Sequence, residues 1–543
     1  MEFDFTKFLR KPVGFNPVPD YGTFNSFGLY AKKLLASLLS PWQKIDALKS
    51  VLFPALQFVM RTGQFKKENW SLLDNAIRHA VKEILYLLEN ASNEYIYGHT
   101  KSGCVGLPAS AEESDLNRVD SAFKLLTSSD EMVSTLALRY LRNALSKRMK
   151  KTDTSDDDLS DFMSGSMEID DEDKPGSNPY SNVWTVSRVA SRRQKIEWSF
   201  TEGVPQLKFQ DLILKSSSRR KILFTIRNRL RQERALALTA KPDQGKAIEC
   251  VAMSLSSSHF IGNGLYTRLS EYRFIHRARL NQLPLNGLPW KEGPSKRCRR
   301  CDKADLETLP HVINYCEAHS RVWQLRHDNI QNRVLDAAKN STAEIISVNN
   351  KIVKSINLRP HIFMKLDIII YLVDITCPFE NRIDGFEKAK QEKIRKYQAL
   401  IEHLLPQASA VEIVPIVVGA LGAWDPANDK FLLKIMAKFY LQTLSKLCVS
   451  DNIRWARDIY VEHITGHRQF DESTTYCPVV IQSMYLRRCL ALLLRILLLL
   501  RITVVLLNNY LELLVCGAPV CKYLVHILNC LSHFVNFSLL YFM

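Results

Sequence analysis

The chain has 543 residues and a mass of 62.3 kDa, enough for two to four domains that each bury a core of their own. With 24% charged and 46% hydrophobic residues, it belongs to neither the disordered nor the fibrous class of proteins. The net charge is +17, and because residues 153–173 contain ten acidic residues and no basic one, the rest of the chain carries +27. Such an excess is typical of proteins that bind a polyanion, and nucleic acid is the first candidate, since solubility alone needs only a few charges.

The cysteines and the N-terminus indicate a reducing compartment. Twelve cysteines in 543 residues are too few for a secreted disulfide scaffold, and the first residues lack the apolar core of a signal peptide. We therefore expect each cysteine to be buried, catalytic or bound to a metal.

Helices are predicted for the first part of the chain, residues 1–151. Ser40 and Pro41 form an N-cap followed by proline at the first helical position, and residues 131–151 form an amphipathic helix with four cations at its end. Residues 152–184 are acidic and rich in Ser and Gly, so we expect a disordered linker there. Helices resume at 185–290, where seven basic residues lie within 218–234 and predict a basic surface rather than an isolated solvated helix face.

A metal-ligand pattern lies within residues 291–330. Cys298, Cys301, His311 and Cys316 follow the spacing C-x2-C-x9-H-x4-C. Three thiolates and one imidazole leave no open position, which favours a structural zinc knuckle. His319 is a competing ligand for His311.

Residues 331–470 predict a small α/β domain, because short β-branched runs alternate with helical stretches. The predicted order is strand 368–373, helix 384–404, strand 413–418 and helix 428–448.

A nuclease-like constellation lies in this domain. A nuclease that uses two metal ions needs carboxylates around a divalent cation and a lysine near the attacking water. Asp374 follows His361 by thirteen residues, and Lys393, Lys396 and Tyr397 lie on one face of the predicted helix. Each residue alone is explained equally well as a strand end or a solvated helix face. As an ordered set they favour a Mg²⁺ site that has lost its first carboxylate to His361.

Asp367 is the nearby acid that would have to replace the missing carboxylate. It lies seven residues before Asp374, and this odd spacing places the two on opposite faces of a continuous strand. We therefore expect no rescue by Asp367.

The last segment, 471–543, has a different composition. A leucine run covers 490–507, and residues 524–543 are twenty residues without Lys, Arg, Asp or Glu, the length of a membrane span. We expect a hydrophobic helical tail. Membrane association through this tail is an alternative function of the chain.

Several segments together resemble the C-terminal half of the open reading frame of site-specific non-LTR retrotransposons of the restriction-like-endonuclease type. The resemblance covers residues 39–470. The segments that carry it, besides the Cys-His cluster, are SPWQKIDALKSVLFPALQF (40–58), ASNEYIYGHTKSGC (91–104), DSAFKLLTS (120–128), KPDQGKAIEC (241–250), YRFIHRARLNQLPLNG (272–287), RHD (326–328), VDITCPFE (373–380), EKIRKY (392–397), VVGALGAWDPAND (417–429) and IRWARDIYVEHITGHRQ (453–469).

The resemblance implies a multidomain protein. Residues 1–151 resemble a reverse transcriptase thumb, 185–290 an all-α basic linker, 291–330 a CCHC zinc knuckle and 331–470 a restriction-like endonuclease. The family nicks chromosomal DNA and copies its own RNA from the exposed end. By this resemblance the metal carboxylates map onto His361 and Asp374, the partners are target duplex DNA and element RNA, and the location is nuclear.

Two departures from the family shape the expected function. We find no polymerase palm, so the chain is not expected to polymerise alone, and a complete element protein would act in trans. The damaged nuclease site suggests a nucleic-acid-binding protein with weak or absent cleavage. A binding-only zinc-knuckle protein is the other hypothesis. The residues predicted to contact nucleic acid are Arg219, Arg220, Lys221, Arg227, Arg231, Arg277, Arg279, Arg299, Arg300, Arg326 and His327.

Overall fold

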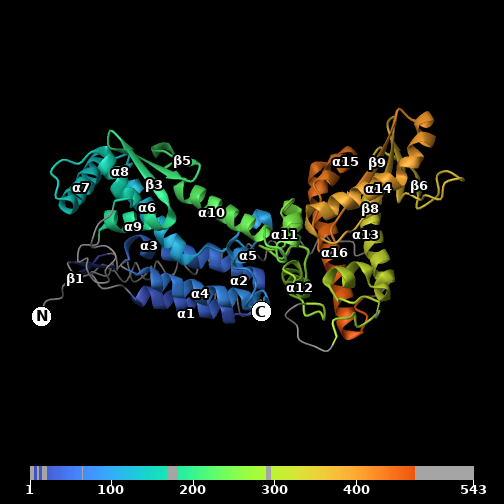
Figure 1. Ribbon diagram of the computed structural model, residues 1–543, viewed down its shortest axis with the longest axis horizontal. Helices are drawn as coiled ribbons and strands as arrows, with labels where there is room; N and C mark the ends of the chain where they lie inside the picture. Colours follow the sequence, from blue (N-terminus) through green and yellow to red (C-terminus); the bar gives the residue numbers. More distant parts are fainter. Residues whose placement is uncertain are drawn as a thin grey trace, which may run out of the picture. The chain divides into compact units, whose positions relative to one another are not determined.

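Helices fill the first part of the chain in the computed structural model, which describes residues 5–8, 11–14, 21–63, 65–167, 182–288, 295–301 and 303–470 (Figure 1). The predicted cap is confirmed: the main-chain N–H of Ser40 donates to Gln43 Oε1 at 3.0 Å, and Pro41 begins the helix. A wider π-type turn, Leu48–Leu52, joins the second helix to the third. The elements are the short strands β1 Phe5–Phe8 and β2 Lys11–Gly14, then α1 Tyr21–Ala36, α2 Pro41–Ala47, α3 Phe53–Thr62, α4 Lys67–Ile84, α5 Asn93–Tyr97 and α6 Ser110–Leu126.

A second hydrophobic core begins in α6 and contains a small antiparallel sheet, β3-β4-β5. Its elements are α7 Glu131–Met149, α8 Asp156–Ser164, α9 Val183–Gln194, β3 Ile196–Thr201, β4 Val204–Phe209, β5 Leu212–Leu214 and the start of α10 Ile222–Thr239. This core runs from Leu116 to Ile226 and therefore crosses the predicted boundaries at 151 and 185.

The prediction of disorder is wrong for residues 156–164. Leu159, Phe162 and Met163 lie on one face of α8 and are fully buried. The acidic residues sit in the first turn of this helix, where the helix dipole stabilises negative charge, and Ser155 accepts a hydrogen bond from the N–H of Asp158. The charge of Asp156, Asp157 and Asp158 therefore belongs to a helix N-terminus, and residues 168–181 of the predicted linker lie outside the described residues.

The prediction of an all-α linker over 185–290 is wrong for residues 196–214, which form the three strands β3, β4 and β5. Ile196, Trp198 and Phe200 point into the core and the residues between them point to solvent, which is the alternation of a half-buried strand. A two-residue turn at Glu202 and Gly203, both with positive φ (53° and 75°), joins β3 to β4.

Replacing Phe162 by alanine tests whether α8 is a folded part of this core. Phe162 is fully buried and the Arg188 guanidinium lies 5.3 Å from its ring centroid. We expect Phe162→Ala to lower the free energy of unfolding by about 3–5 kcal/mol, measured by urea denaturation. Asp157→Ala, an exposed change in the same helix, is the control and should change it by only a few tenths. Equal stability of the two variants would mean that α8 is not packed in solution.

The predicted α/β order is confirmed in the last part of the described chain, except that the predicted helix 428–448 is divided into two helices at Met436 and Ala437. The four-stranded sheet has the order β6-β7-β8-β9, in which β6, β7 and β8 are antiparallel and β8 and β9 are parallel, joined by the helix α14 (Figure 1). In this part of the described chain, three α-helices precede the sheet: α11 Lys246–Val251, α12 Leu269–Arg279 and α13 Ser320–Lys339. The strands and helices that follow are β6 Glu344–Val348, β7 Ile362–Leu366, β8 Ile369–Thr376, α14 Arg382–Leu404, β9 Ala410–Val417, α15 Ala427–Ile435 and α16 Lys438–Thr465.

The predicted hydrophobic tail, residues 471–543, lies outside the described residues. Within the part of the chain that the structure describes, no helix combines the length and the apolar composition that crossing a membrane requires. Membrane association through the tail stays a prediction.

Candidate metal centre and nuclease-like site

The four predicted zinc ligands converge just before α13. Their donor atoms all lie within 4.8 Å of one another. Cys298 Sγ is 3.8 Å from Cys316 Sγ, and Cys301 Sγ is 3.3 Å from His311 Nε2. The last two ligands flank a single wide turn, His311–Tyr315, in which the N–H of Cys316 donates to the carbonyl of His311 at 2.7 Å.

These distances fit a tetrahedral zinc ion. With Zn–S near 2.3 Å and Zn–N near 2.05 Å, tetrahedral angles require S···S of about 3.8 Å and S···N of about 3.5 Å. The observed separations agree, and three thiolates with one imidazole are the usual donor set of a structural zinc. The cluster is therefore compatible with zinc, in which case these side chains would hold the ion with no position left for a substrate.

His319 belongs to a second group of donor atoms, with Cys316 and His463, that also lie within 4.8 Å of one another. Its Nε2 lies 3.0 Å from Nδ1 of His463, whose Nε2 lies 2.9 Å from Glu307 Oε1. Glu307 is also held by Arg299, whose Nε and Nη2 each donate at 2.8 Å. The predicted choice of His311 over His319 thus agrees with the four-donor cluster. Sequence spacing gave no signal for His463, because it comes from the end of α16, far along the chain.

The predicted nuclease residues come from three elements. His361 precedes β7 and lies opposite Asp374 of β8, because Ile362 pairs with Val373. His361 Nδ1 is 2.5 Å from Asp374 Oδ1, and Lys393 Nζ of α14 is 2.7 Å from Asp374 Oδ2.

Tyr397 completes this cluster one helical turn after Lys393. Its hydroxyl lies 3.3 Å from Asp374 Oδ1 and 3.0 Å from the carbonyl of Arg359. Lys396 does not join it: its side chain is exposed and Nζ lies 4.7 Å from the centroid of the Tyr397 ring. Four of the five predicted residues therefore meet.

His327 is an unforeseen neighbour of this cluster. Its ring centroid is 4.3 Å from that of His361, and its Nε2 lies 3.3 Å from the carbonyl of Ile375. The helix α13 places His327 beside His361, and the predicted contact of His327 with nucleic acid stays a prediction. The RHD segment carried the resemblance, but no spacing rule connects it to Asp374.

The charges of the cluster are balanced within the protein. Burial by itself raises the pKa of Asp374, but the His361 hydrogen bond and the Lys393 charge outweigh it, and the pKa lies below its usual range. Burial and the Asp374 charge raise the pKa of Tyr397. At neutral pH the site thus contains an ionised aspartate beside a protonated tyrosine.

The residues around Asp374 do not fit Mg²⁺. This ion prefers oxygen ligands in octahedral geometry, whereas the described side chains that contact Asp374 are the imidazole of His361, the ammonium group of Lys393 and the neutral hydroxyl of Tyr397. The Nδ1 atom of His361 either donates a hydrogen bond to Asp374 or accepts one from the N–H of Ile375, 2.8 Å away. In both cases this atom already makes a contact within the protein. Asp367 gives no help, because it lies in the turn between β7 and β8, at the opposite end of β8.

Two basic residues predicted to contact nucleic acid are buried, and that prediction is wrong for them. Arg279 is 2% exposed and donates to the carbonyls of Ser257 and Leu421. Arg326 is 3% exposed and donates to Asn314 Oδ1 at 3.0 Å. Both side chains bind loops of the protein, and the basic motifs alone could not distinguish this from a surface role.

The remaining predicted contacts are at least partly accessible. Arg299 holds Glu307, and Arg300 donates to the carbonyl of His463 at 2.7 Å, at the end of α16. The others, Arg219, Arg220, Lys221, Arg227, Arg231 and Arg277, are half-buried or exposed. Their contact with nucleic acid stays a prediction.

Comparison with known proteins connects the chain to retrotransposons. No family model matches it. It is 18% identical over 452 residues, 79% of this chain and 81% of the relative, to a protein of Popillia japonica described as the retrovirus-related Pol polyprotein from type-1 retrotransposable element R2. It is also 23% identical over 266 residues, 47% of this chain and 76% of the relative, to an uncharacterized protein of Caenorhabditis elegans.

The first of these similarities spans most of both proteins and supports a relationship of this chain to non-LTR retrotransposon polyproteins. The similarity thus supports a retrotransposon-related function, and the cysteine-histidine cluster is compatible with zinc binding.

Proposed function

We propose that this chain is a nucleic-acid-binding protein of the restriction-like-endonuclease type of retrotransposon, whose nuclease-like site binds DNA and cleaves it feebly or not at all. The observation that supports this is the Asp374 cluster. Asp374, Lys393 and Tyr397 converge there, while the position of the second carboxylate holds His361. The proposed ligands are target duplex DNA and element RNA, the proposed partner is a complete element protein in trans, and the proposed location is the nucleus.

The alternative is a zinc-knuckle protein that binds nucleic acid without cleavage. It is favoured by the ion pairs that neutralise Asp374 inside the protein. Both functions require nucleic-acid binding, and they differ in whether any Mg²⁺-dependent nicking of DNA is measured.

Binding to duplex DNA should weaken steeply as salt rises, because the excess cations displace counterions from phosphates. The logarithm of the binding constant should fall against log[salt] with a slope of about −0.9 for each phosphate contacted. Lys396 is exposed and follows Lys393 by three residues, so it lies on the side of α14 that faces the Asp374 cluster. We expect Lys396→Gln to make the slope shallower by about 0.9, measured by fluorescence anisotropy with the full chain.

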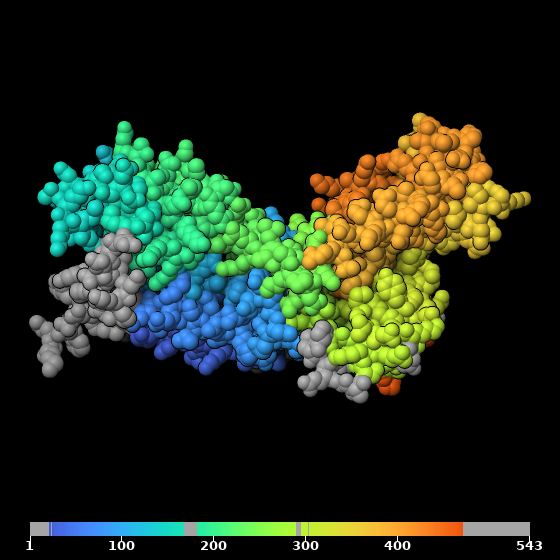
Figure 2. All heavy atoms as spheres, in the orientation of Figure 1, coloured from blue at the N-terminus to red at the C-terminus, as the bar shows by residue number. Residues whose placement is uncertain are grey.

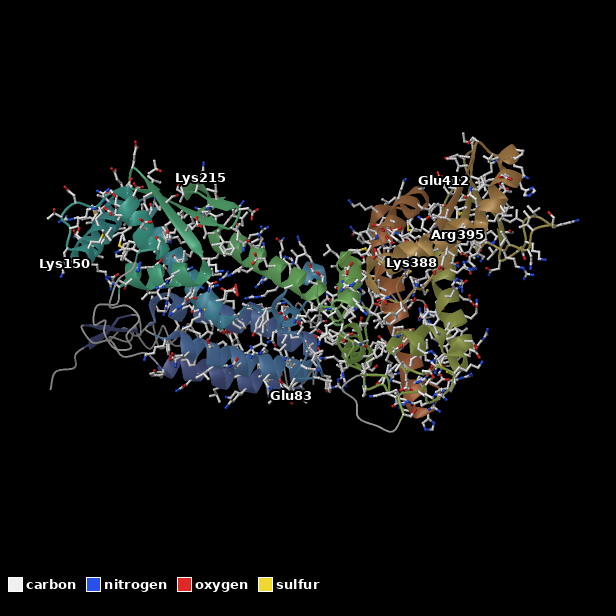
Figure 3. The ribbon with its side chains drawn as sticks, viewed as in Figure 1. Glu83, Lys150, Lys215, Lys388, Arg395 and Glu412 are labelled. Carbon is white, nitrogen blue, oxygen red and sulfur yellow. The ribbon has the colours of Figure 1, made fainter. Side chains whose placement is uncertain are left out.

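The matched control is Lys388→Gln on the same helix. Lys388 and Arg395 project from the exposed face of α14 (Figure 3). Lys388 lies five residues before Lys393, on a different side of the helix. The control should keep the wild-type slope. A flat salt profile for the wild-type protein would contradict the proposed binding function.

A further inference from the structure

An open groove separates α3 from α10. It has a volume of about 180 Å³, and we call it the α3–α10 groove; the lining residues that matter below are Lys49, Gln57, Glu113, Phe224, Asn228 and Arg231. The groove is bounded by the turn before α3, the start of α6 and one face of α10. In the space-filling view the residues of α10, in green, meet the blue residues of the preceding helices (Figure 2).

The groove has an excess of positive charge. Lys49, Arg227 and Arg231 face one carboxylate, that of Glu113, which forms an ion pair with Arg227. Lys49 Nζ donates to the carbonyl of Val105 at 2.6 Å. Among the residues that the structure describes, the guanidinium of Arg231 has no hydrogen-bond partner. The charges of Glu113 and Glu112 offset part of the charge of Arg231, and that of Asp46 offsets part of the charge of Lys49, but the lining of the groove still has more cations than acids.

Burial makes this imbalance costly. Burial, and then the charge of Arg231, lower the pKa of Lys49 to about 8. The pKa of Arg231 is also lowered, chiefly by burial. An anion bound between the two side chains would offset both effects, because an opposite charge stabilises each protonated form.

The other side chains of the groove suit a nucleobase. Phe224 is 67% exposed, and Asn228 and Arg231 follow it by four and seven residues, so the three lie along one face of α10. An exposed aromatic ring stacks on a base, and the amides of Asn228 and Gln57 both donate and accept hydrogen bonds, as a base edge requires.

The size of the groove argues against a paired base. Pockets that enclose drug-sized ligands have volumes of about 300–1,000 Å³, so 180 Å³ holds a smaller unit. In a duplex the faces of the bases are stacked on each other, so an aromatic side chain cannot stack on a base that stays paired. An unpaired nucleotide can instead turn its base onto the ring while its phosphate meets the cations.

We propose that the α3–α10 groove binds one unpaired nucleotide of a single-stranded nucleic acid, with its phosphate between Lys49 and Arg231 and its base stacked on Phe224. This inference rests on the proposed nucleic-acid-binding function and adds a strand preference and a location to it. The groove is distinct from the Asp374 cluster, which comes from β7, β8 and α14.

The test compares a short unstructured RNA strand, the same sequence as DNA, and a duplex, each bound to the full chain in anisotropy titrations. We expect Phe224→Ala to weaken binding to the single strands on the order of ten-fold and to leave duplex binding unchanged. Lys49→Gln combined with Arg231→Gln should make the salt slope for single strands shallower by about 0.7 for each side chain. An Arg231→Lys variant should restore part of that slope, because it keeps the charge.

Two variants serve as controls. Leu236→Ala changes another exposed apolar residue of α10, 68% exposed, and Arg220→Gln removes an exposed cation outside the groove. Neither should alter the preference for single strands. Because Phe224 is exposed, Phe224→Ala should fold even if the double variant does not. In that case the binding of Phe224→Ala alone decides the test.

Each outcome decides the question. Salt-dependent binding by the wild type with no change in Phe224→Ala would overturn the groove assignment and leave the proposed function standing. Equal weakening for single strands and duplex would overturn the strand preference. Absence of salt-dependent binding by the wild type would overturn the groove and the proposed function together.

Discussion

Replacing His361 by aspartate is expected to produce Mg²⁺-dependent nicking of DNA by a protein that otherwise nicks feebly or not at all. The substitution supplies the second carboxylate opposite Asp374, at a position that the pairing of β7 with β8 already fixes. A carboxylate can also accept the hydrogen bond that the N–H of Ile375 now donates to His361 Nδ1. The local backbone should therefore tolerate the change.

The gain should be at least about 100-fold in the rate of nicking of a supercoiled plasmid. Mutating a residue that only hydrogen-bonds to a metal ligand typically lowers metal affinity or activity by about 10–100-fold. A residue that binds the metal directly through oxygen should have a larger effect. Lys393 already lies beside Asp374, so the lysine that such a nuclease needs near the attacking water is present.

The control for this experiment is His361→Asn, which has nearly the shape of aspartate but no charge. It should stay as inactive as the wild type, and adding Asp374→Asn to His361→Asp should remove the nicking. Asp367 lies at the other end of β8, so it should not replace the missing carboxylate. Strong nicking by the unmodified protein that disappears in Asp367→Ala would therefore contradict the proposal that His361 impairs the site.

Local patterns predicted the elements and the first group of ligands well. The zinc ligands lie within nineteen residues, so their spacing alone limits how far apart they can be. The strand that ends near Asp374 and the helix that carries Lys393 were visible as a β-branched run followed by a helical pattern. His361 and Asp374 met because two adjacent antiparallel strands bring a thirteen-residue spacing to one end of a hairpin.

Two elements that differ from the prediction have a local signal in the sequence. The acidic segment has the high charge of a disordered linker, but Leu159, Phe162 and Met163 repeat at helical spacing within it. The strand at Ile196 had a readable period of two that we assigned to helix. In contrast, no local signal could show that Arg279 and Arg326 point inward, or that His327 and His463 reach sites formed by distant segments.

Loss of the metal at the knuckle is the second large expected effect. We expect about one zinc ion per chain by elemental analysis, and essentially none in Cys301→Ser. Structural zinc in small domains contributes about 10–16 kcal/mol to folding, so its loss should unfold the knuckle outright rather than loosen it.

The consequence should extend to the end of α16. Arg300, between the first two cysteine ligands, donates to the carbonyl of His463 at 2.7 Å, and His463 Nε2 lies 2.9 Å from Glu307 Oε1. Without the ion, the knuckle no longer holds Arg300 and Glu307 in position for these contacts. Hydrogen exchange of the last turn of α16 should therefore accelerate in Cys301→Ser, while α8, in the second core, should exchange at the wild-type rate.

Two histidine variants decide which imidazole binds the ion. His311→Gln should lose zinc as Cys301→Ser does, because His311 Nε2 lies 3.3 Å from Cys301 Sγ in the four-donor cluster. His319→Gln should keep one zinc per chain with an affinity lowered by at most about 10–100-fold, since His319 groups with Cys316 and His463 and is not a member of the four-donor cluster. Full zinc in Cys301→Ser, or equal zinc loss in the two histidine variants, would mean that the ligands are wrongly assigned.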